Sequence, residues 1–145
     1  MQLKIQALSG YHDRVEVLLH AAFQVLVDFM EKEEPDKLIN WESDAGHSKV
    51  WKEMKELYVW YTKRRPNRKD PLDNPKLKCP SLKTKKITNK KKPGHDLYFL
   101  LDYNHKKYKA YDKAIKEFQR LEVQWREEDQ KNLHRLIDVR GYLWT

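Results

Sequence analysis

The stretch Val17–Met30, which reads V-L-L-H-A-A-F-Q-V-L-V-D-F-M, decides the fold. It contains no proline or glycine, and its only polar residues are His20, Gln24 and Asp28. Because these residues recur at every fourth position, a helix would place them on one narrow polar line along an otherwise apolar cylinder. The stretch therefore predicts a buried helix that the rest of the chain packs around.

The flanks of this stretch carry helix boundary signals. Asp13 followed by Glu16 resembles a capping box, and Pro35 stops a helix, so we predict a helix from about Arg14 to Glu33. Before it, residues 2–8 alternate loosely between apolar and polar types, which is typical of a short edge strand or an extended arm.

A second helix is predicted after a loop at residues 35–47 that holds one short helical turn. Ser48 is its predicted N-cap, and the helix ends at Lys63-Arg64-Arg65, before Pro66. Its apolar residues recur at steps of three and four and should pack on the first helix: Val50, Trp51, Met54, Leu57, Tyr58 and Tyr61.

The segment 95–144 also has a helical pattern, with a kink or break near 126–131, or a protruding end that pairs with another copy of the chain. Gly141 is the predicted C-terminal cap, after which residues 142–144 fold back. With few glycines and many charged residues, the chain is predicted to be a single all-α domain over residues 1–145, a small helical bundle or hairpin with a long C-terminal helix.

The net charge of +8 is unevenly distributed. Residues 63–92 hold 13 Lys and Arg but only two acids, so they carry +11, while the remaining residues carry −3. This segment includes a Pro/Lys-rich loop, predicted at about 66–94, that cannot bury enough apolar surface to fold alone. A basic patch of this kind attracts polyanions, although lysine without interleaved aromatic residues indicates non-specific attraction.

A candidate ligand site lies where the second helix meets this loop. Arginine forks bind phosphate oxygens, and aromatic rings stack on bases, which together suit a nucleotide or nucleic acid. The opposing interpretation, which stays open, is that the rings belong to the core and the arginines pair with acidic residues. The candidate residues are Trp60, Tyr61, Arg64, Arg65, Arg68 and Lys69.

Catalytic signals are weak. We favour a structural role for His20, Gln24 and Asp28 over a catalytic or metal-binding one, because buried polar groups usually satisfy one another. The dipeptides His12-Asp13 and His95-Asp96 occur in HD-type phosphohydrolases, but both fall at predicted helix starts, where aspartate is a common cap. We predict no catalytic residue, no metal and no cofactor, and a metal-dependent phosphohydrolase is the least favoured alternative.

The lone cysteine, Cys79, allows no internal disulfide, which indicates a reducing, intracellular setting. The longest apolar run is shorter than the roughly 20 residues that cross a membrane. We therefore expect a soluble, cytoplasmic protein without a membrane partner.

Several blocks of the sequence resemble a group of small, uncharacterised proteins of tailed bacteriophages. They are S-G-Y-H-D at 9–13, L-L-H-A-A-F-Q-V-L-V-D-F at 18–29, L-Y-V-W-Y at 57–61, R-P-N-R at 65–68 with D-P-L-D at 70–73, and R-L-I-D-V-R-G-Y-L-W-T at 135–145. The resemblance covers nearly the whole chain except the lysine-rich insert. It implies a phage-encoded accessory protein in the cytoplasm of the infected bacterial host, serving host takeover or counter-defence, and it supplies no catalytic residue.

The leading hypothesis is a non-enzymatic protein that binds an anionic ligand, either a nucleotide signal or nucleic acid, through the arginine and aromatic residues and the basic loop. The alternative is a protein-interaction module that inhibits a host enzyme. Its anchors would be Trp41, Trp125 and the terminal Tyr142-Leu143-Trp144.

Overall fold

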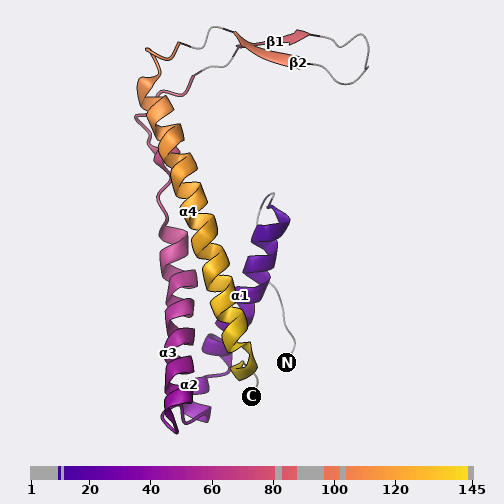
Figure 1. Ribbon diagram of the computed structural model, residues 1–145, viewed down its shortest axis with the longest axis vertical. Coiled ribbons are helices and arrows are strands. Elements are labelled where there is room, and N and C mark those ends of the chain that lie inside the picture. Colours follow the sequence, from indigo (N-terminus) through magenta and orange to yellow (C-terminus); the bar gives the residue numbers. More distant parts are fainter. Residues whose placement is uncertain (1–9, 11, 81–82, 88–96, 102–103, 144–145) are drawn as a thin grey trace. The chain divides into compact units, whose positions relative to one another are not determined.

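The computed structural model of the chain describes residues 10, 12–80, 83–87, 97–101 and 104–143 (Figure 1). The predicted all-α class is confirmed: helices dominate, and the strands described form one two-stranded hairpin. The predicted N-terminal strand at residues 2–8 lies outside the described residues. The helices and strands are α1 (Arg14–Lys32), α2 (Pro35–Leu38), α3 (Ala45–Val59), β1 (Lys83–Ile87), β2 (Leu97–Leu101) and α4 (Lys109–Val139).

The chain divides into two compact units. Unit 1 comprises Met1–Arg68 and Gln124–Thr145, and unit 2 comprises Lys69–Val123. Helix α4 contributes its first half to unit 2 and its second half to unit 1, so each unit is described on its own below.

The core of unit 1 is built around α1, as Val17–Met30 predicted, but the start of this stretch is not buried, because Val17 and Leu18 are 45% and 63% exposed. Phe23, Leu26 and Phe29 have no solvent exposure. They belong to a cluster that also contains Met54 and Leu57 of α3. Fully burying apolar side chains of this size stabilises a fold by about 1.5–3 kcal/mol each. The same cluster includes Leu136 and Val139 of α4.

The start of α1 agrees with the prediction, but its cap does not. The helix begins at Arg14 with Asp13 as N-cap residue, yet the Asp13 side chain makes no capping hydrogen bond. Glu16 instead lies against His12, with 2.9 Å between Glu16 Oε2 and His12 Nδ1. The capping box is therefore absent, because Glu16 is engaged by the histidine side chain.

The predicted start of the second helix is corrected by four residues, from an N-cap at Ser48 to one at Asp44. Helix α3 begins at Ala45, and Asp44 Oδ1 accepts hydrogen bonds from the backbone N–H groups of Gly46 and His47, at 2.7 and 2.9 Å. Ser48 Oγ instead donates to the Trp41 carbonyl oxygen at 3.1 Å. A carboxylate at Asp44 gains from the positive end of the helix dipole, which a serine hydroxyl does not.

The end of α3 changes its helical geometry. A π-helical turn spans Trp60–Arg64, and a 3-10 turn at Arg65–Asn67 follows it. The Thr62 hydroxyl donates to the Tyr58 carbonyl oxygen at 2.7 Å within this region. Single π turns occur often at functional sites, and this one carries Trp60, Tyr61 and Arg64, three of the candidate residues predicted from the sequence.

The prediction of a helix from residue 95 and of a loop throughout 66–94 is wrong. Residues 97–101 form β2, which pairs antiparallel with β1 in the register Lys83↔Leu101 to Ile87↔Leu97. The helix begins only at Lys109, after a turn in which the Asn104 side chain accepts a hydrogen bond from the Lys107 N–H. Leu97 and Leu101 fit a helical stripe and a strand equally well.

Helix α4 runs without interruption for 31 residues, so no break occurs at 126–131. Its length is about 47 Å at the usual rise per residue. A short 3-10 turn at Arg140–Tyr142 follows it, and Gly141 lacks the positive φ of the predicted cap. Leu143 then packs against the core, whereas Trp144 lies outside the described residues.

Within the residues that the structure describes, none of the helices has the length and apolar character needed to cross a bilayer.

Candidate functional site

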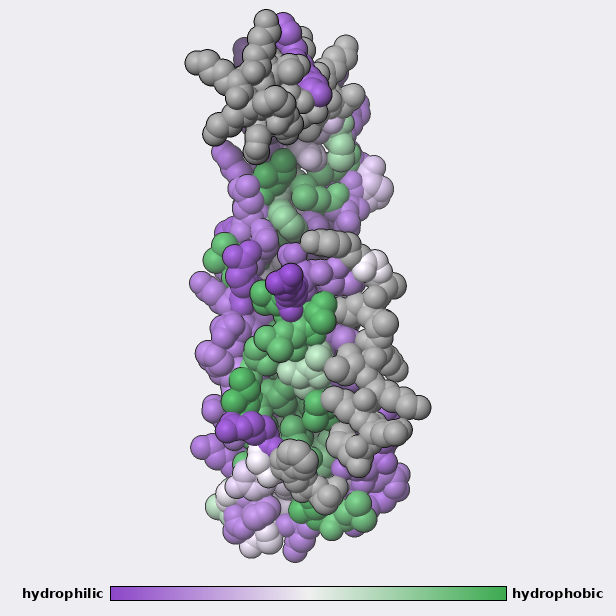
Figure 2. Space-filling model, turned by 90° about the vertical axis from the view of Figure 1, so that its right-hand side faces the viewer, coloured by the Kyte–Doolittle hydropathy of each residue, from purple (hydrophilic) through white to green (hydrophobic). Residues whose placement is uncertain are grey.

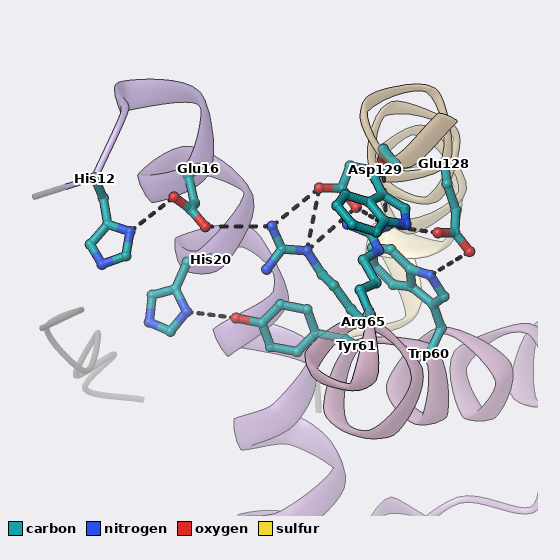
Figure 3. A network of polar contacts seen from close by, with 10 residues as sticks. His12, Glu16, His20, Trp60, Tyr61, Arg65, Glu128 and Asp129 are labelled. Carbon is teal, nitrogen blue, oxygen red and sulfur yellow. Dashed lines mark hydrogen bonds and ion pairs between the residues drawn. The ribbon is translucent and has the colours of Figure 1, made fainter. Parts of the chain in front are cut away.

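Arg65 directly follows the π turn and reaches Asp129 in the second half of α4 (Figure 3). Arg68, which follows the 3-10 turn, reaches the same half of α4. The Arg65 guanidinium lies 3.1 Å from Asp129, and Arg68 also pairs with Asp129. Arg68 makes a second ion pair with Glu128, at 2.7 Å. Both arginines therefore already have carboxylate partners within unit 1.

Two indole rings enclose Arg68. Its guanidinium carbon lies 5.8 Å from the Trp60 ring centroid and 5.7 Å from that of Trp125, within the range of cation–π attraction. Trp60, only 3% exposed, donates its N–H to Glu128 at 2.9 Å. Burial alone would lower the pKa of Arg68, but its hydrogen bonds to Asp129 and Glu128 raise that pKa overall.

Tyr61 is held on the other side of the π turn. Its ring stacks on Phe23 with 4.8 Å between centroids, and its hydroxyl lies 2.6 Å from His20 Nδ1 (Figure 3). Burial raises the pKa of the Tyr61 hydroxyl. Glu16 lies 3.8 Å from Arg65 and extends the polar contacts to the start of α1. Tyr61 is thus part of the packing between α1 and α3.

The polar line of α1 is satisfied within unit 1. Gln24 Nε2 donates to Asp28 Oδ1 at 2.8 Å, and Lys32 pairs with the same carboxylate at 2.8 Å. The hydrogen bond from Lys32 is the main cause that lowers the pKa of Asp28. No buried side-chain nitrogen or oxygen of the described residues lacks a hydrogen-bond partner. This arrangement agrees with a structural role for His20, Gln24 and Asp28.

The structure thus brings Trp60, Arg65 and Arg68 together around two carboxylates, and it leaves Arg64 and Lys69 exposed. Sequence reasoning anticipated acidic partners on the last helix but did not single out Glu128 and Asp129. The acidic run 127–129 is the available signal, but as an interruption of the apolar stripe it predicts a kink or break near 126–131, or a protruding end, instead of a pairing site.

The aromatic anchors of the protein-interaction hypothesis are mostly packed. Trp41 is 5% exposed and stacks on Trp51 with 4.8 Å between centroids. Trp125 lies against Arg68, and Tyr142 is 38% exposed. The terminal Trp144 is not among the described residues.

A different apolar surface is exposed on unit 1. Val15 and Leu18 of α1 are 74% and 63% exposed. Figure 2 shows hydrophobic side chains gathered on a face of the molecule. The sequence places both residues in the predicted helix but does not predict that they are exposed.

Unit 2 presents a line of cations on the first half of α4, here called the cationic row: Lys109, Lys113, Lys116 and Arg120. All four side chains are exposed. Arg120 pairs with Glu117 at 2.6 Å. The three lysines make no ion pair with any residue in the described part of the chain.

The division into units also separates the charge. Unit 2 contains 15 Lys and Arg and seven Asp and Glu, so it carries the whole net charge of +8. Unit 1 contains 15 residues of each sign and is neutral. The excess positive charge of this protein therefore lies in unit 2.

The histidine-aspartate pairs are only partly described. His12 contacts Glu16, and Asp13 is exposed at the start of α1, whereas His95-Asp96 lies outside the described residues. Among the residues described, no three His, Cys, Asp or Glu side chains are grouped so that they could hold a metal ion.

No protein-family model, curated protein or solved structure matches the chain. The resemblance to small phage proteins therefore stays a prediction, and function has to be argued from the residues themselves.

Proposed function

We propose that the protein is a non-enzymatic binder of nucleic acid and that unit 2 is the binding unit. The observation that carries this proposal is the charge division: unit 2 holds all of the net +8, and unit 1 is neutral. Lysine and arginine that neutralise phosphates release condensed counterions, which supplies most of the affinity in non-specific binding.

The ion pairs that the cations already form favour unit 2 as the phosphate-binding region, rather than the arginines that follow the π turn. To bind a phosphate, Arg68 would have to leave Glu128 and Asp129, and an uncompensated partly buried charge is costly. Lys109, Lys113 and Lys116 have no such partner among the described residues. Their charge is available to a ligand without breaking an existing contact.

The packing of Trp60 and Tyr61 favours a nucleic-acid polymer over a single nucleotide as the ligand. A nucleotide site uses an aromatic face for the base. Trp60 is buried against Arg68, and Tyr61 is stacked on Phe23, so neither ring of the predicted site is free for a base. The proposed setting is the cytoplasm of an infected bacterium, as the resemblance to phage proteins implies.

Fluorescence anisotropy with a labelled duplex tests this proposal. Between about 50 and 200 mM salt, the logarithm of the binding constant should fall linearly with the logarithm of the salt concentration. Absence of binding at the lower salt concentration, or binding that does not respond to salt, would contradict the proposal.

A second candidate function rests on the exposed apolar residues of α1. Val15 and Leu18 are 74% and 63% exposed, and apolar surface of this kind is common where proteins bind one another. Retention of a host protein at high salt, lost in Val15→Ser/Leu18→Ser but kept in Val123→Ser, would support this function. Val123 is a suitable control because it is an exposed valine, at 54%, on a different helix.

A further inference from the structure

The cationic row lies on one side of α4. Its members follow one another at steps of four, three and four residues, the spacing that aligns side chains on a helix. At 1.5 Å per residue, the row extends over about 16 Å of the helix axis. Lys106 and Lys107 precede it, and both are exposed.

The acidic residues beside the row leave most of its charge available. Asp112 lies 3.0 Å from His105, and Glu117 pairs with Arg120. Lys109, Lys113 and Lys116 form no ion pair with a carboxylate in the described part of the chain, although the pKa of Glu117 is lowered by the hydrogen bond from Arg120 and also by the nearby charge of Lys113. Three adjacent cations therefore face solvent, along a shallow hollow that they share with His105 and Asp112.

The rings of this half of α4 lie on the opposite side. Tyr111 and Phe118 are each two residues from a member of the row, which turns them about 200° around the helix. Both are partly buried, whereas the row is exposed. A strand bound along the row would meet phosphate-binding groups but neither of these two rings, and the Tyr108 ring beside the row is covered by Lys107, 5.2 Å from its centroid.

The separation of the cations from the rings on α4 favours duplex over single-stranded nucleic acid as the ligand. Proteins that bind single strands without sequence preference combine a basic groove with stacking rings. Duplex DNA offers one phosphate charge per about 1.7 Å of axis and needs no base contact to be held. A row of cations on the first half of α4, whose described rings, Tyr111 and Phe118, lie on the opposite side, is matched to the denser backbone charge of a duplex.

We infer that the cationic row is the phosphate-contacting face of unit 2, and that it binds duplex nucleic acid in preference to single strands and without reading sequence. This inference rests on the proposed function. It assigns that function to three lysines and an arginine that the sequence did not single out.

The test compares two triple variants that remove the same charge. Lys109→Ala/Lys113→Ala/Lys116→Ala removes the row, and Lys52→Ala/Lys63→Ala/Lys131→Ala removes three exposed lysines of unit 1 that form no ion pair with a described residue. Alanine favours helix, so α4 should persist in the first variant. Circular dichroism and thermal melting of both variants check this.

The row variant should bind a duplex at least about tenfold more weakly at about 50 mM salt, with a salt slope smaller by roughly three. The control variant should keep the slope of the unchanged protein. Two duplexes of unrelated sequence should bind alike, and a single strand of equal length should bind more weakly.

Equal losses in the two triple variants would overturn the assignment to the row, while the proposed function would stand. Tighter binding of the single strand, or a clear preference between the two duplexes, would also overturn it. If the unchanged protein bound neither nucleic acid, the proposed function itself would fail.

Discussion

Arg68 shows how its neighbours decide what a charged residue can do. An arginine close to Trp60 and Tyr61 has the composition of a nucleotide site, and the sequence offers such a site there as one of two open interpretations, the other being pairing with acidic residues. In the structure, Arg68 is enclosed by Trp60 and Trp125 and paired with Glu128 and Asp129. The same chemistry that recognises a phosphate here joins the π turn to α4.

Arg68→Ala should therefore lower the free energy of unfolding by about 2 kcal/mol, because Glu128 and Asp129 lose their shared cation and keep only Trp60 and Arg65 as partners, and two cation–π contacts are lost. Urea unfolding measures the effect. Arg64→Ala is the matched control, since Arg64 is exposed and makes no ion pair with a described residue, and it should change stability by less than about 0.5 kcal/mol. Similar decreases in the free energy of unfolding in both variants would show that the contacts of Arg68 do not stabilise the fold.

Asp28 gives stability a dependence on pH. Its pKa is lowered below the ordinary value of 3.8 in the folded protein, chiefly by the hydrogen bond from Lys32. A carboxyl with a lowered folded-state pKa stabilises the fold above its unfolded pKa, and that contribution disappears as pH falls through the folded-state value.

The unchanged protein should therefore be more stable than Asp28→Asn at pH 6, and the difference should shrink as the pH falls below about 4. Thermal melting of both proteins across this range measures it. A difference in melting temperature that stays constant down to pH 2 would contradict the assignment.

At the scale of elements, α1 was predictable and β2 was not. The bounds of α1 follow from local signals, the apolar periodicity and Pro35, and agree with the structure to within one residue. The segment L-Y-F-L-L at 97–101 has no signal that separates helix from strand, because its pairing partner, β1, lies ten or more residues away. Pairing between distant segments is invisible to a local pattern.

The candidate site was predictable in kind but not in detail. The sequence grouped Trp60 with Arg65 and Arg68, and it offered acidic pairing as one of two interpretations. It did not place Asp129 between the two arginines, because that requires the packing of α4 against the π turn.

The N-terminus of α3 offers a direct comparison of two caps. Asp44→Ala removes two hydrogen bonds to backbone N–H groups, whereas Ser48→Ala removes one to a loop carbonyl. Asp44→Ala should therefore lower the melting temperature more than Ser48→Ala does. A larger decrease in melting temperature from Ser48→Ala would instead indicate that Ser48 is the N-cap of α3.

For the whole molecule, counting charges along the chain shows that the net charge is positive, but it does not show which residues form the basic surface. Residues 63–92 stand out at +11, whereas residues 93–123 hold six Lys and Arg against five Asp and Glu and look nearly neutral. Only the helical geometry of α4 places four of those cations on one side. A linear count averages them with the acids on the rest of the helix.

Because α4 continues through both units, its own stability should vary along its length. None of residues 109–123 is buried, whereas Asn132, Leu136 and Val139 are. Helical segments with little burial open locally at a small free-energy cost. Hydrogen–deuterium exchange should therefore be faster in the first half of α4 than in the second, and uniform protection along the helix would contradict this.

A bound duplex would change that exchange pattern most where protection is weakest. A ligand held by residues 109–120 would stabilise only the closed form of this half of the helix. Amide exchange along this single helix would thus report the position of the ligand. Exchange should slow at residues 109–120 and stay unchanged at Leu136 when the ligand is bound.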